Sequence, residues 1–297
     1  MSRFYQHLTK SLSNKIPDDL LQHLPRSYKR MGEVALVSIV PEIQEFKQII
    51  AQEILLLVKK SRIFSVAEII SPIDGKTRQP HLEILAGEQI KETIHKELNC
   101  SFMIHIDKIM FSAGNHGERK RLIKWFEKIK KYYPDIKKPI HFLDMFTCVG
   151  NLSLAVAKNV SDIRVIGLEI NPDAIYYLKK NIEINKLTNF EAISGDNVKI
   201  APKGWADVIS MGYFGISSEQ LKVALKALRG PIGWIFIHDT KKIDKNSQIL
   251  EEFKRILNTK EFSFFKLKNI NEKRIKSIAP STEHWVYECQ LELELNY

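Results

Sequence analysis

Cysteine is scarce in this chain, and long apolar runs are absent. Three cysteines occur among 297 residues, at Cys100, Cys148 and Cys289, and no two of them form a CxxC pair. This spacing argues against a disulfide framework or a zinc site, so no metal is predicted, and it fits a reducing cytoplasm. No run of roughly eighteen apolar residues is present, and the N-terminus lacks the apolar core of a signal peptide. We therefore expect a cytoplasmic protein that makes no contact with a membrane.

Glycine-rich nucleotide-binding signatures are missing as well. The dinucleotide fingerprint needs three glycines in one turn, but here Thr147, Cys148 and Asn151 surround a single Gly150. The Walker sequence, a lysine and a hydroxyl residue after a longer glycine loop, is also absent. Gly150 still lets the backbone approach a ligand closely. The turn therefore predicts a nucleotide site of another kind.

The composition is that of a folded and basic protein. Hydrophobic residues make up 44% of the chain and charged residues 27%, which suits one large domain and a smaller one. The formal net charge is +10, and basic residues gather at residues 26–30, 59–62, 128–138 and 266–276. This balance favours a polyanionic partner such as nucleic acid. A lysine-rich surface that is merely solvated is the alternative.

From residue 140 onward, apolar runs alternate with helical patterns. Three successive runs end in an acid, at Asp144, Glu169 and Asp196, and a helical pattern follows each of the first two. This alternation predicts a Rossmann-like, doubly wound α/β domain with a mostly parallel sheet. Residues 284–295 alternate with a period of two, which predicts an antiparallel C-terminal hairpin.

The earlier part of the chain shows shorter and more varied patterns. Residues 42–60 have helical spacing, and short alternating segments with intervening turns come before and after them. Residues 1–108 are therefore predicted to form a smaller α+β domain that recognises the partner. Residues 109–139 are predicted to form a helical connector with a helix at 119–131, and residues 140–297 the catalytic domain.

The acids at the strand ends suit a nucleotide, since Glu169 can accept hydrogen bonds from a ribose diol. The turn that begins at Asp144 and the later acid Asp196 resemble those of class I S-adenosylmethionine-dependent transferases. The resemblance implies that Asp196 and Asn197 meet the adenine and that residues 144–150, including Phe146, wrap the methionine portion. It makes S-adenosyl-L-methionine the expected cosubstrate. The alternative is an α/β domain whose acids only cap helices.

Several longer segments carry a family resemblance. They are PRSYKRMGEVALV (25–37), RQPHLEILAGE (78–88), HKELNCSFMIHIDKIMFSAGNHGERKRL (95–122), DMFTCVGN (144–151) and KSIAPSTEHWV (276–286). Together they resemble the tRNA-modifying enzymes that act on the guanosine just 3′ of the anticodon. The resemblance spans nearly the whole chain from about residue 25. It implies tRNA as the partner and a transferase activity.

That family has two branches. One transfers methyl to guanosine N1 and carries Pro-Arg after a Phe-Ser pair and Asn-Leu-Pro-Lys after the fourth strand. The other, the wybutosine-synthesis branch, transfers the 3-amino-3-carboxypropyl group to C7 of a tricyclic wyosine precursor, 4-demethylwyosine, in tRNA-Phe and releases methylthioadenosine. Here FSAGN (111–115) and SMGYFGISS (210–218) replace the methyl-branch motifs. Both differences favour the wybutosine branch, and the tRNA guanosine-N1 methyltransferase stays the alternative.

Transfer of the aminocarboxypropyl group poses a positioning problem. The sulfonium is already a good leaving group, so the enzyme must place the γ-carbon, and not the methyl, in line with the base. The resemblance places Ser112 and Arg119 against the cofactor. Arg119, the first of three candidate catalytic residues, can bind the α-carboxylate through two parallel hydrogen bonds. The ordinary alternatives are a turn cap for Ser112 and an ion pair for Arg119.

The remaining candidates follow the fourth and fifth predicted strands. Met211 and Gly212 are assigned to the cofactor pocket. Tyr213 and Phe214 are expected to stack on the tricyclic base, with a place in the core as the alternative. Tyr213 and His238 complete the candidate catalytic residues. We expect a monomer, and the non-enzymatic alternative is an RNA-binding protein that kept the fold and lost catalysis.

Overall fold

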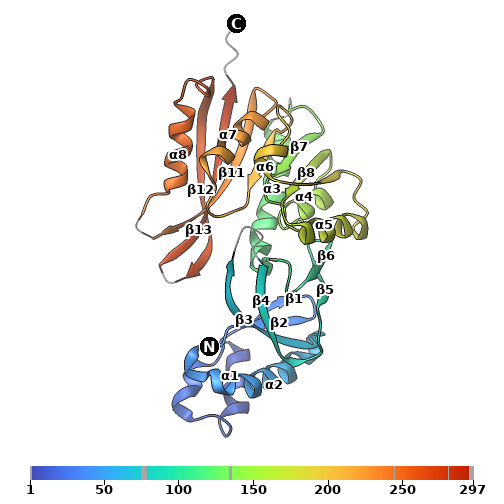
Figure 1. Ribbon diagram of the computed structural model, residues 1–297, viewed down its shortest axis with the longest axis vertical. Helices are drawn as coiled ribbons and strands as arrows, with labels where there is room; N and C mark the ends of the chain where they lie inside the picture. The colour runs from blue at the N-terminus through green and yellow to red at the C-terminus, as the bar shows by residue number, and fades with distance from the viewer. Residues whose placement is uncertain (1, 75–78, 134–135, 244, 280, 294–297) are drawn as a thin grey trace. The chain divides into compact units, whose positions relative to one another are not determined.

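The chain folds into two compact units (Figure 1). The computed structural model describes residues 2–74, 79–133, 136–243, 245–279 and 281–293. The first unit comprises residues 1–97 and 101–115, and the second comprises residues 98–100 and 116–297. The boundaries expected at residues 108 and 139 stay a prediction. The helix expected in the connector is present as α3 (His116–Tyr132), within the second unit.

The first unit is an α+β structure, as predicted. Its four-stranded sheet has the order β1 (Lys29–Met31), β2 (Val34–Val37), β3 (Ser65–Asp74), β4 (Gln79–Gly87). Its longer helices are α1 (Arg3–Leu12) and α2 (Lys47–Val58), and its 3-10 helices are η1 (Asp18–His23), η2 (Pro41–Phe46), η3 (Lys59–Ser61) and η4 (Ala113–Asn115). Ile50 and Ile54 of α2 are fully buried with Leu8 and Leu12 of α1 in one core cluster. Helical spacing of apolar residues therefore gives α2 its buried face. Strands β5 (Glu92–Glu97) and β6 (Cys100–His105) pair as a separate sheet.

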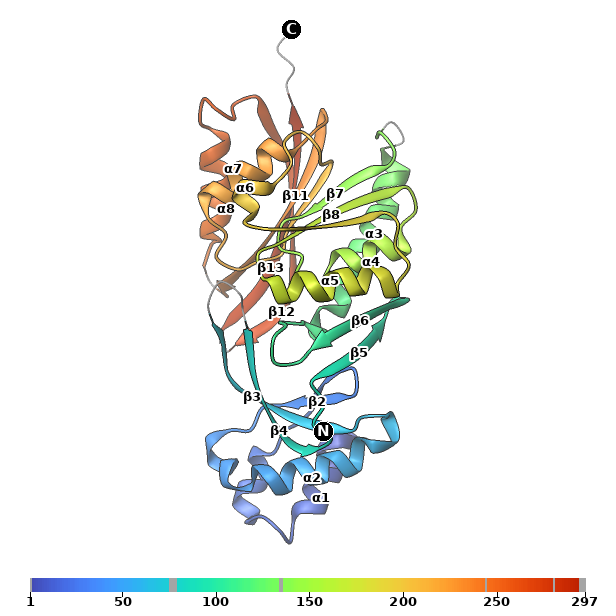
Figure 2. The same ribbon diagram turned by 45° about the vertical axis from the view of Figure 1, so that its right-hand side comes forward.

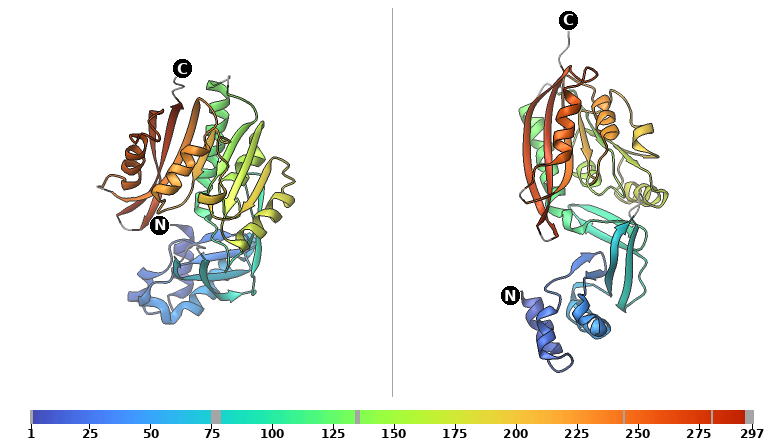
Figure 3. Two further views of the ribbon diagram at one scale, coloured as in Figure 1. Left: turned by 45° about the horizontal axis from the view of Figure 1, so that its top comes forward. Right: turned by 60° about the vertical axis from the view of Figure 1, so that its left-hand side comes forward.

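The second unit contains one seven-stranded sheet. Its strands in spatial order are β12 (Phe265–Ala279), β13 (Thr282–Leu293), β11 (Ile232–Lys242), β10 (Val208–Met211), β7 (Ile140–Asp144), β8 (Ile163–Glu169) and β9 (Phe190–Ser194). Strands β7 to β11 run parallel to one another, whereas β13 is antiparallel to both β11 and β12. Figure 3 shows β12 and β13 as the long C-terminal hairpin. The predicted Rossmann-like domain with an antiparallel hairpin is confirmed.

Helices cover both faces of this sheet (Figure 2). One face carries α3, α4 (Ser153–Asn159) and α5 (Pro172–Ile184), and the other carries α6 (Asn197–Ile200), α7 (Ser218–Ala227) and α8 (Gln248–Leu257). The predicted caps are present. The Asn171 side chain accepts from Asp173 N at the start of α5, and Ser217 forms a capping box with Gln220 at the start of α7. No helix among the described residues is long and apolar enough to span a membrane.

The packing of the two faces differs in character. On the α3 face, the Trp125 ring meets Trp234 and Phe236 of β11 edge-on, with ring centroids 5.6 and 4.8 Å apart. On the other face, Phe253 of α8 is fully buried in a large and mainly aliphatic cluster with Ile235 of β11. The chain runs outward from β7 to β8 and β9 and then returns to β10 on the other side of β7. The carboxyl ends of β7 and β10 therefore flank the topological switch point, where such sheets bind ligands.

Candidate functional site

The turn after β7 is tied to both neighbouring strands. Met145 N donates to Ser210 O of β10 at 3.0 Å, and Thr147 N donates to Leu168 O of β8 at 3.1 Å. Gly150 has a φ of +89°, and a Cβ there would lie 2.7 Å from a side-chain carbon of α4. Both facts require glycine at this position. The backbone of residues 145–151 is thus held rigidly at the switch point.

Glu169, at the end of β8, is held by backbone amides. Its Oε2 accepts from Cys148 N and its Oε1 from Asn171 N, each at 2.8 Å. Burial raises the pKa of Glu169, and these N–H groups act in the opposite direction. A carboxylate has about four lone-pair positions, so Glu169 can also accept from a ribose hydroxyl. Cys148 contributes its backbone N–H here.

Asp144 and Ser210 lie side by side at the switch point. They are register partners on β7 and β10, and their side chains are buried. Within the described part of the chain, Asp144 Oδ2 and Ser210 Oγ have no hydrogen-bond partner. Burial raises the pKa of Asp144 to about 6, although a hydrogen bond with the Ser153 side chain favours its charged form. Buried polar atoms without partners are rare, so this pair fits the polar end of a bound ligand.

The third acid begins helix α6. Asp196 is the N-cap of this helix, and its Oδ1 accepts from Val198 N at 3.0 Å. The neighbouring Asn197 is buried, donates through Nδ2 to Met145 O at 2.9 Å, and accepts at Oδ1 from Gln220 at 3.2 Å. Asn197 therefore ties the β7 turn to α7. The expected contact of Asp196 and Asn197 with an adenine stays a prediction.

Two of the predicted residues stack directly on each other. The rings of Phe146 and Tyr213 lie 4.9 Å apart and are inclined by only 14°. Just before Tyr213 in the chain, Met211 is the last residue of β10 and is fully buried, and Gly212 is exposed. The structure thus joins the β7 turn to the loop after β10 through aromatic contact. Phe214, the next residue, meets a histidine of β13 edge-on.

Arg119 lies against the same turn. Its side chain, on the first turns of α3, is fully buried, and Nε donates to the backbone carbonyl of Asn151. The structure thereby brings Arg119 to the segment predicted to wrap the methionine portion. Ser112 belongs to the first unit, so its expected role beside Arg119 stays a prediction.

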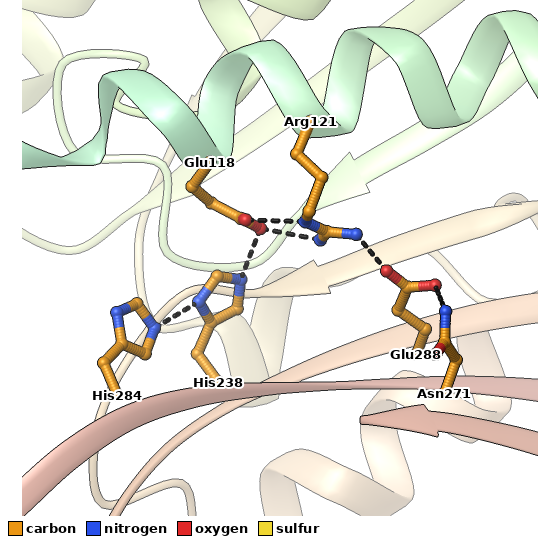
Figure 4. A network of polar contacts seen from close by, with 6 residues as sticks. All are labelled: Glu118, Arg121, His238, Asn271, His284 and Glu288. Atoms are coloured by element: carbon orange, nitrogen blue, oxygen red, sulfur yellow. Dashed lines mark hydrogen bonds and ion pairs between the residues drawn. The ribbon is translucent and has the colours of Figure 1, made fainter. Parts of the chain in front are cut away.

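A second group of polar side chains connects α3 to the C-terminal hairpin (Figure 4). Arg121 donates through Nε and Nη2 to the two carboxylate oxygens of Glu118, both at 2.7 Å, and through Nη1 to Glu288. Asn271 Nδ2 donates to the other oxygen of Glu288 at 2.9 Å. We call the whole group the histidine network; its members are Glu118, Arg121, His238, Asn271, His284 and Glu288.

The two histidines of this network touch each other. His238 Nδ1 and His284 Nε2 are 2.9 Å apart, and Glu118 Oε1 lies 4.0 Å from His238 Nε2. Because Met211 at the end of β10 pairs with Ile237, His238 is the first residue of β11 beyond that end. The pair therefore lies at the carboxyl edge of the sheet, where the predicted site is.

Burial keeps both imidazoles neutral. It lowers the pKa of His238 to about 3, and the positive charge of Arg121 adds to this effect. Burial likewise lowers the pKa of His284 to about 3, helped by His238 and Lys276 and opposed by Glu118. At neutral pH each ring therefore has one N–H donor and one lone-pair acceptor.

Several polar residues of the site and of the histidine network were not predicted as site residues, among them Ser210, Glu118, Arg121 and His284. Ser210, Glu118 and Arg121 are adjacent or nearly adjacent to predicted residues, and a polar residue in a buried strand or helix face was the available signal. His284 gave no such signal, since 46 positions separate it from His238. In the described ranges, no cluster of three or more His, Cys, Asp or Glu residues could hold a metal ion.

The fold and the site define the class of the protein. A parallel sheet with a reversed C-terminal hairpin, an acid ending the second strand, and a tight glycine turn after the first are features of class I S-adenosylmethionine-dependent transferases. The sequence profile of the TRM5/TYW2 methyltransferase domain matches residues 93–265, and that of the TYW2 N-terminal domain matches residues 8–91. The chain belongs to the TRM5/TYW2 family.

Relatives of both branches are similar to it. The tRNA(Phe) (4-demethylwyosine(37)-C(7)) aminocarboxypropyltransferase of Methanocaldococcus jannaschii is 30% identical over 89% of this chain and 98% of that protein. The crystal structure of Pyrococcus horikoshii TYW2 in complex with MeSAdo has a TM-score of 0.75 at 28% identity and covers 98% of this chain and all of that one. The tRNA (guanine(37)-N(1))-methyltransferase Trm5b of Pyrococcus abyssi is 31% identical over 72% of this chain and 60% of that protein.

Proposed function

We propose that this protein transfers the 3-amino-3-carboxypropyl group of S-adenosylmethionine to C7 of 4-demethylwyosine in tRNA(Phe) and releases methylthioadenosine. The observation that carries the proposal is the extent of the match. Residues 8–91 match the TYW2 N-terminal domain, and similarity to the M. jannaschii aminocarboxypropyltransferase covers nearly the full length of that enzyme. The Trm5b relative is matched over only 60% of its length.

The residues of the second unit fit the group donor. S-adenosylmethionine supplies an electrophilic carbon and a sulfide leaving group. Glu169 accepts from the ribose with the lone pairs that its backbone donors leave open. Asp144 Oδ2 and Ser210 Oγ, which have no hydrogen-bond partner among the described residues, meet the polar end of the methionine portion. These roles are independent of which carbon reacts.

Arg119 sets which carbon reacts. A guanidinium binds a carboxylate through two parallel N–H groups, and Arg119 is buried beside the turn with its Nε already fixed on Asn151 O. A grip on the α-carboxylate extends the amino-acid arm, so the γ-carbon and not the methyl faces the base. The Phe146–Tyr213 stack offers a flat aromatic surface next to that carbon.

The expected partner is tRNA carrying the tricyclic precursor. The net charge of +10 favours a polyanion, and the lysines and arginines of β12 add a basic stretch on the C-terminal hairpin. A monomeric state and a cytoplasmic location are part of the same expectation.

A double-label experiment tests the proposal. Protein and precursor-bearing tRNA are incubated with S-adenosylmethionine labelled either in the methyl group or in the carboxyl group. We expect carboxyl label in the RNA and methyl label in released methylthioadenosine. Methyl label in the RNA, above all with an unmodified transcript that carries guanosine, would assign the protein to the methyl-transferring branch. Salt-sensitive RNA binding without transfer of either label would instead indicate a non-enzymatic RNA-binding protein.

A further inference from the structure

The transfer reaction produces a proton that must leave the base, and the histidine network contains an acceptor for it. We propose that His284 Nδ1 accepts the proton from C7 and that His238 and Glu118 orient the His284 ring from behind. We call these three residues the relay. This inference rests on the proposed function. In it His284 is the catalytic residue, and His238 and Glu118 are positioning residues that act through His284.

The contacts assign the tautomers. The Glu118 carboxylate lies 4.0 Å from His238 Nε2, too far for a hydrogen bond but near enough to favour a proton on that nitrogen. His238 Nδ1 is then the acceptor in the 2.9 Å contact with His284, and His284 Nε2 is the donor. His284 Nδ1 is left with a lone pair. This assignment puts a basic nitrogen at the end of the chain.

Among the described residues, none forms a hydrogen bond with that nitrogen. His284 is 2% exposed, and its Nδ1 is buried without a hydrogen-bond partner among the described residues. In Figure 4 it points away from His238. A histidine that served only to join β11 to β13 would need just one nitrogen, and an unpartnered buried nitrogen lowers stability. The orphaned lone pair therefore indicates a ligand that donates to it.

The surroundings are suited to a flat base. The Phe214 ring meets the His284 ring edge-on at 4.9 Å, and Tyr213, one residue earlier, stacks on Phe146 of the β7 turn. The loop from Gly212 to Ser217 thus links the cofactor turn to His284. A tricyclic base that replaces the Phe214 edge against His284 presents its ring hydrogen to Nδ1.

The step balances without another reactant. C7 uses a ring electron pair to form a bond to the γ-carbon while the γ-carbon–sulfur bond breaks, and methylthioadenosine leaves with that electron pair. The base is then a cation whose C7 bears both hydrogen and the new substituent. The C7–H bond gives its electrons back to the ring, and the proton goes to His284 Nδ1. Because aromaticity is restored, this cation is a strong acid, and a weakly basic imidazole suffices to accept its proton.

The rest of the network holds the relay in place. Arg121 binds both oxygens of Glu118 and reaches Glu288, so the Glu118 carboxylate cannot turn away from His238. The charged groups that face the two rings are Glu118 and Arg121 from α3 and Lys276 from β12. Two positive charges and burial keep the rings unprotonated, which leaves His284 Nδ1 ready to accept.

Single-turnover transfer with saturating donor and precursor-bearing tRNA tests the relay. The variant His284→Phe keeps a ring against Phe214 but has no nitrogen, and we expect its single-turnover rate to fall about 10²–10³-fold. Steady-state rates at varied donor and tRNA concentrations should give KM values near those of the wild type. The matched control is His141→Phe. His141 lies at the opposite, amino end of β7, where its ring stacks on Trp205 with the ring centroids 4.4 Å apart. Its replacement should therefore leave the rate unchanged.

Three further readouts separate proton acceptance from structural support. A tRNA deuterated at C7 should react more slowly than the protonated one with His284→Phe, because proton loss then limits the rate, and equally fast with the wild type. Added imidazole should restore part of the rate of His284→Ala. His238→Asn, whose amide oxygen can still accept from His284, should retain more activity than His238→Phe.

The outcomes are distinguishable from failure of the proposed function. If wild-type protein transfers no aminocarboxypropyl group, the proposed function is wrong, and the relay with it. If the wild type transfers the group and His284→Phe matches it in rate, with no isotope effect and no response to imidazole, only the relay is overturned. Equal loss in His238→Asn and His238→Phe would remove His238 from the relay.

Discussion

The two ends of the central sheet hold their charged side chains in different ways. At β7 to β9, the carboxylates of Glu169 and Asp196 are held by backbone N–H groups. Glu169 accepts from Asn171 and from Cys148 in the turn after β7, and Asp196 accepts from Val198. At β11 to β13, the members of the histidine network are held by one another's side chains. The first arrangement depends on local chain geometry. The second depends on four elements, α3, β11, β12 and β13, coming together.

Because the histidine network is held by its own side chains, we expect the largest loss of folding stability when Arg121 is replaced. Arg121→Ala leaves the nearly buried carboxylates of Glu118 and Glu288 without their cation, and we expect the free energy of unfolding to fall by about 3 kcal/mol or more. Urea unfolding measures this. Arg255→Ala is the matched control, since Arg255 also binds both oxygens of a glutamate three residues earlier, but on the surface. The control should change stability little. Equal effects in the two variants would mean that the network adds nothing by being buried.

Arg119 lies on α3, which also carries Glu118 and Arg121, and it binds the turn after β7. Its loss should lower the rate of group transfer. Arg119→Met removes the fork that binds the carboxylate, and a hydrogen bond to a charged group contributes about 1.5–3 kcal/mol, so we expect transfer to slow about 10–100-fold. Binding of methylthioadenosine, which lacks the carboxylate, should change much less. Arg119→Lys should fall between, because it keeps the charge without the fork. Transfer at the wild-type rate in Arg119→Met would contradict the grip on the carboxylate.

Glu169 tests the backbone-held region. Glu169→Ala removes the acceptor for the ribose, and we expect S-adenosylmethionine to bind about tenfold or more weakly, with tRNA affinity unchanged. Calorimetric titration of donor and tRNA measures both affinities. Glu183→Ala, on the exposed side of α5, is the control. Unchanged donor affinity in Glu169→Ala would remove Glu169 from the ribose role.

The two regions should also respond to pH in opposite directions. His238 and His284 have pKa values of about 3 in the folded protein, below the ordinary 6.5, so the unfolded chain binds more protons between these values. Their contribution to stability is therefore complete above pH 6.5 and is lost as the pH falls from there toward 3, by up to about 1.4 kcal/mol per ring and pH unit. The pKa of Asp144 is raised from 3.8 to about 6, so its effect has the other sign. The folded state gains protons there, and acidification from pH 6 toward 4 stabilises it.

Urea midpoints between pH 7 and pH 5 measure the balance. Two histidines outweigh one aspartate, so the wild type should lose stability on acidification. His284→Phe should lose less, and Asp144→Asn should lose more, since each variant removes one of the opposing groups. The same pH slope in all three proteins would show that these buried groups do not titrate as described.

The local region was the predictable one. The acids Asp144, Glu169 and Asp196 each end an apolar run, and Gly150 is the single glycine of the turn. The hydrophobic periodicity and the turn residues were therefore enough to predict these four residues at the ends of strands and in the turn. The Phe146–Tyr213 stack and the His238–His284 pair were beyond reach, because no local pattern shows which side chains meet across 46 or more residues. Ser210 illustrates the same limit. Its neighbour Met211 was chosen from the motif after the strand, yet the pairing of β10 with β7 puts Ser210 beside Asp144.

Mass spectrometry of the modified nucleoside distinguishes transfer of the aminocarboxypropyl group from transfer of methyl. Precursor-bearing tRNA(Phe) is treated with the protein and S-adenosylmethionine and digested, and the mass of its tricyclic nucleoside is measured. We expect a gain equal to one 3-amino-3-carboxypropyl group in place of the C7 hydrogen, with fragmentation that keeps the addition on the base. A gain equal to one methyl group, or an unaltered nucleoside, would contradict it.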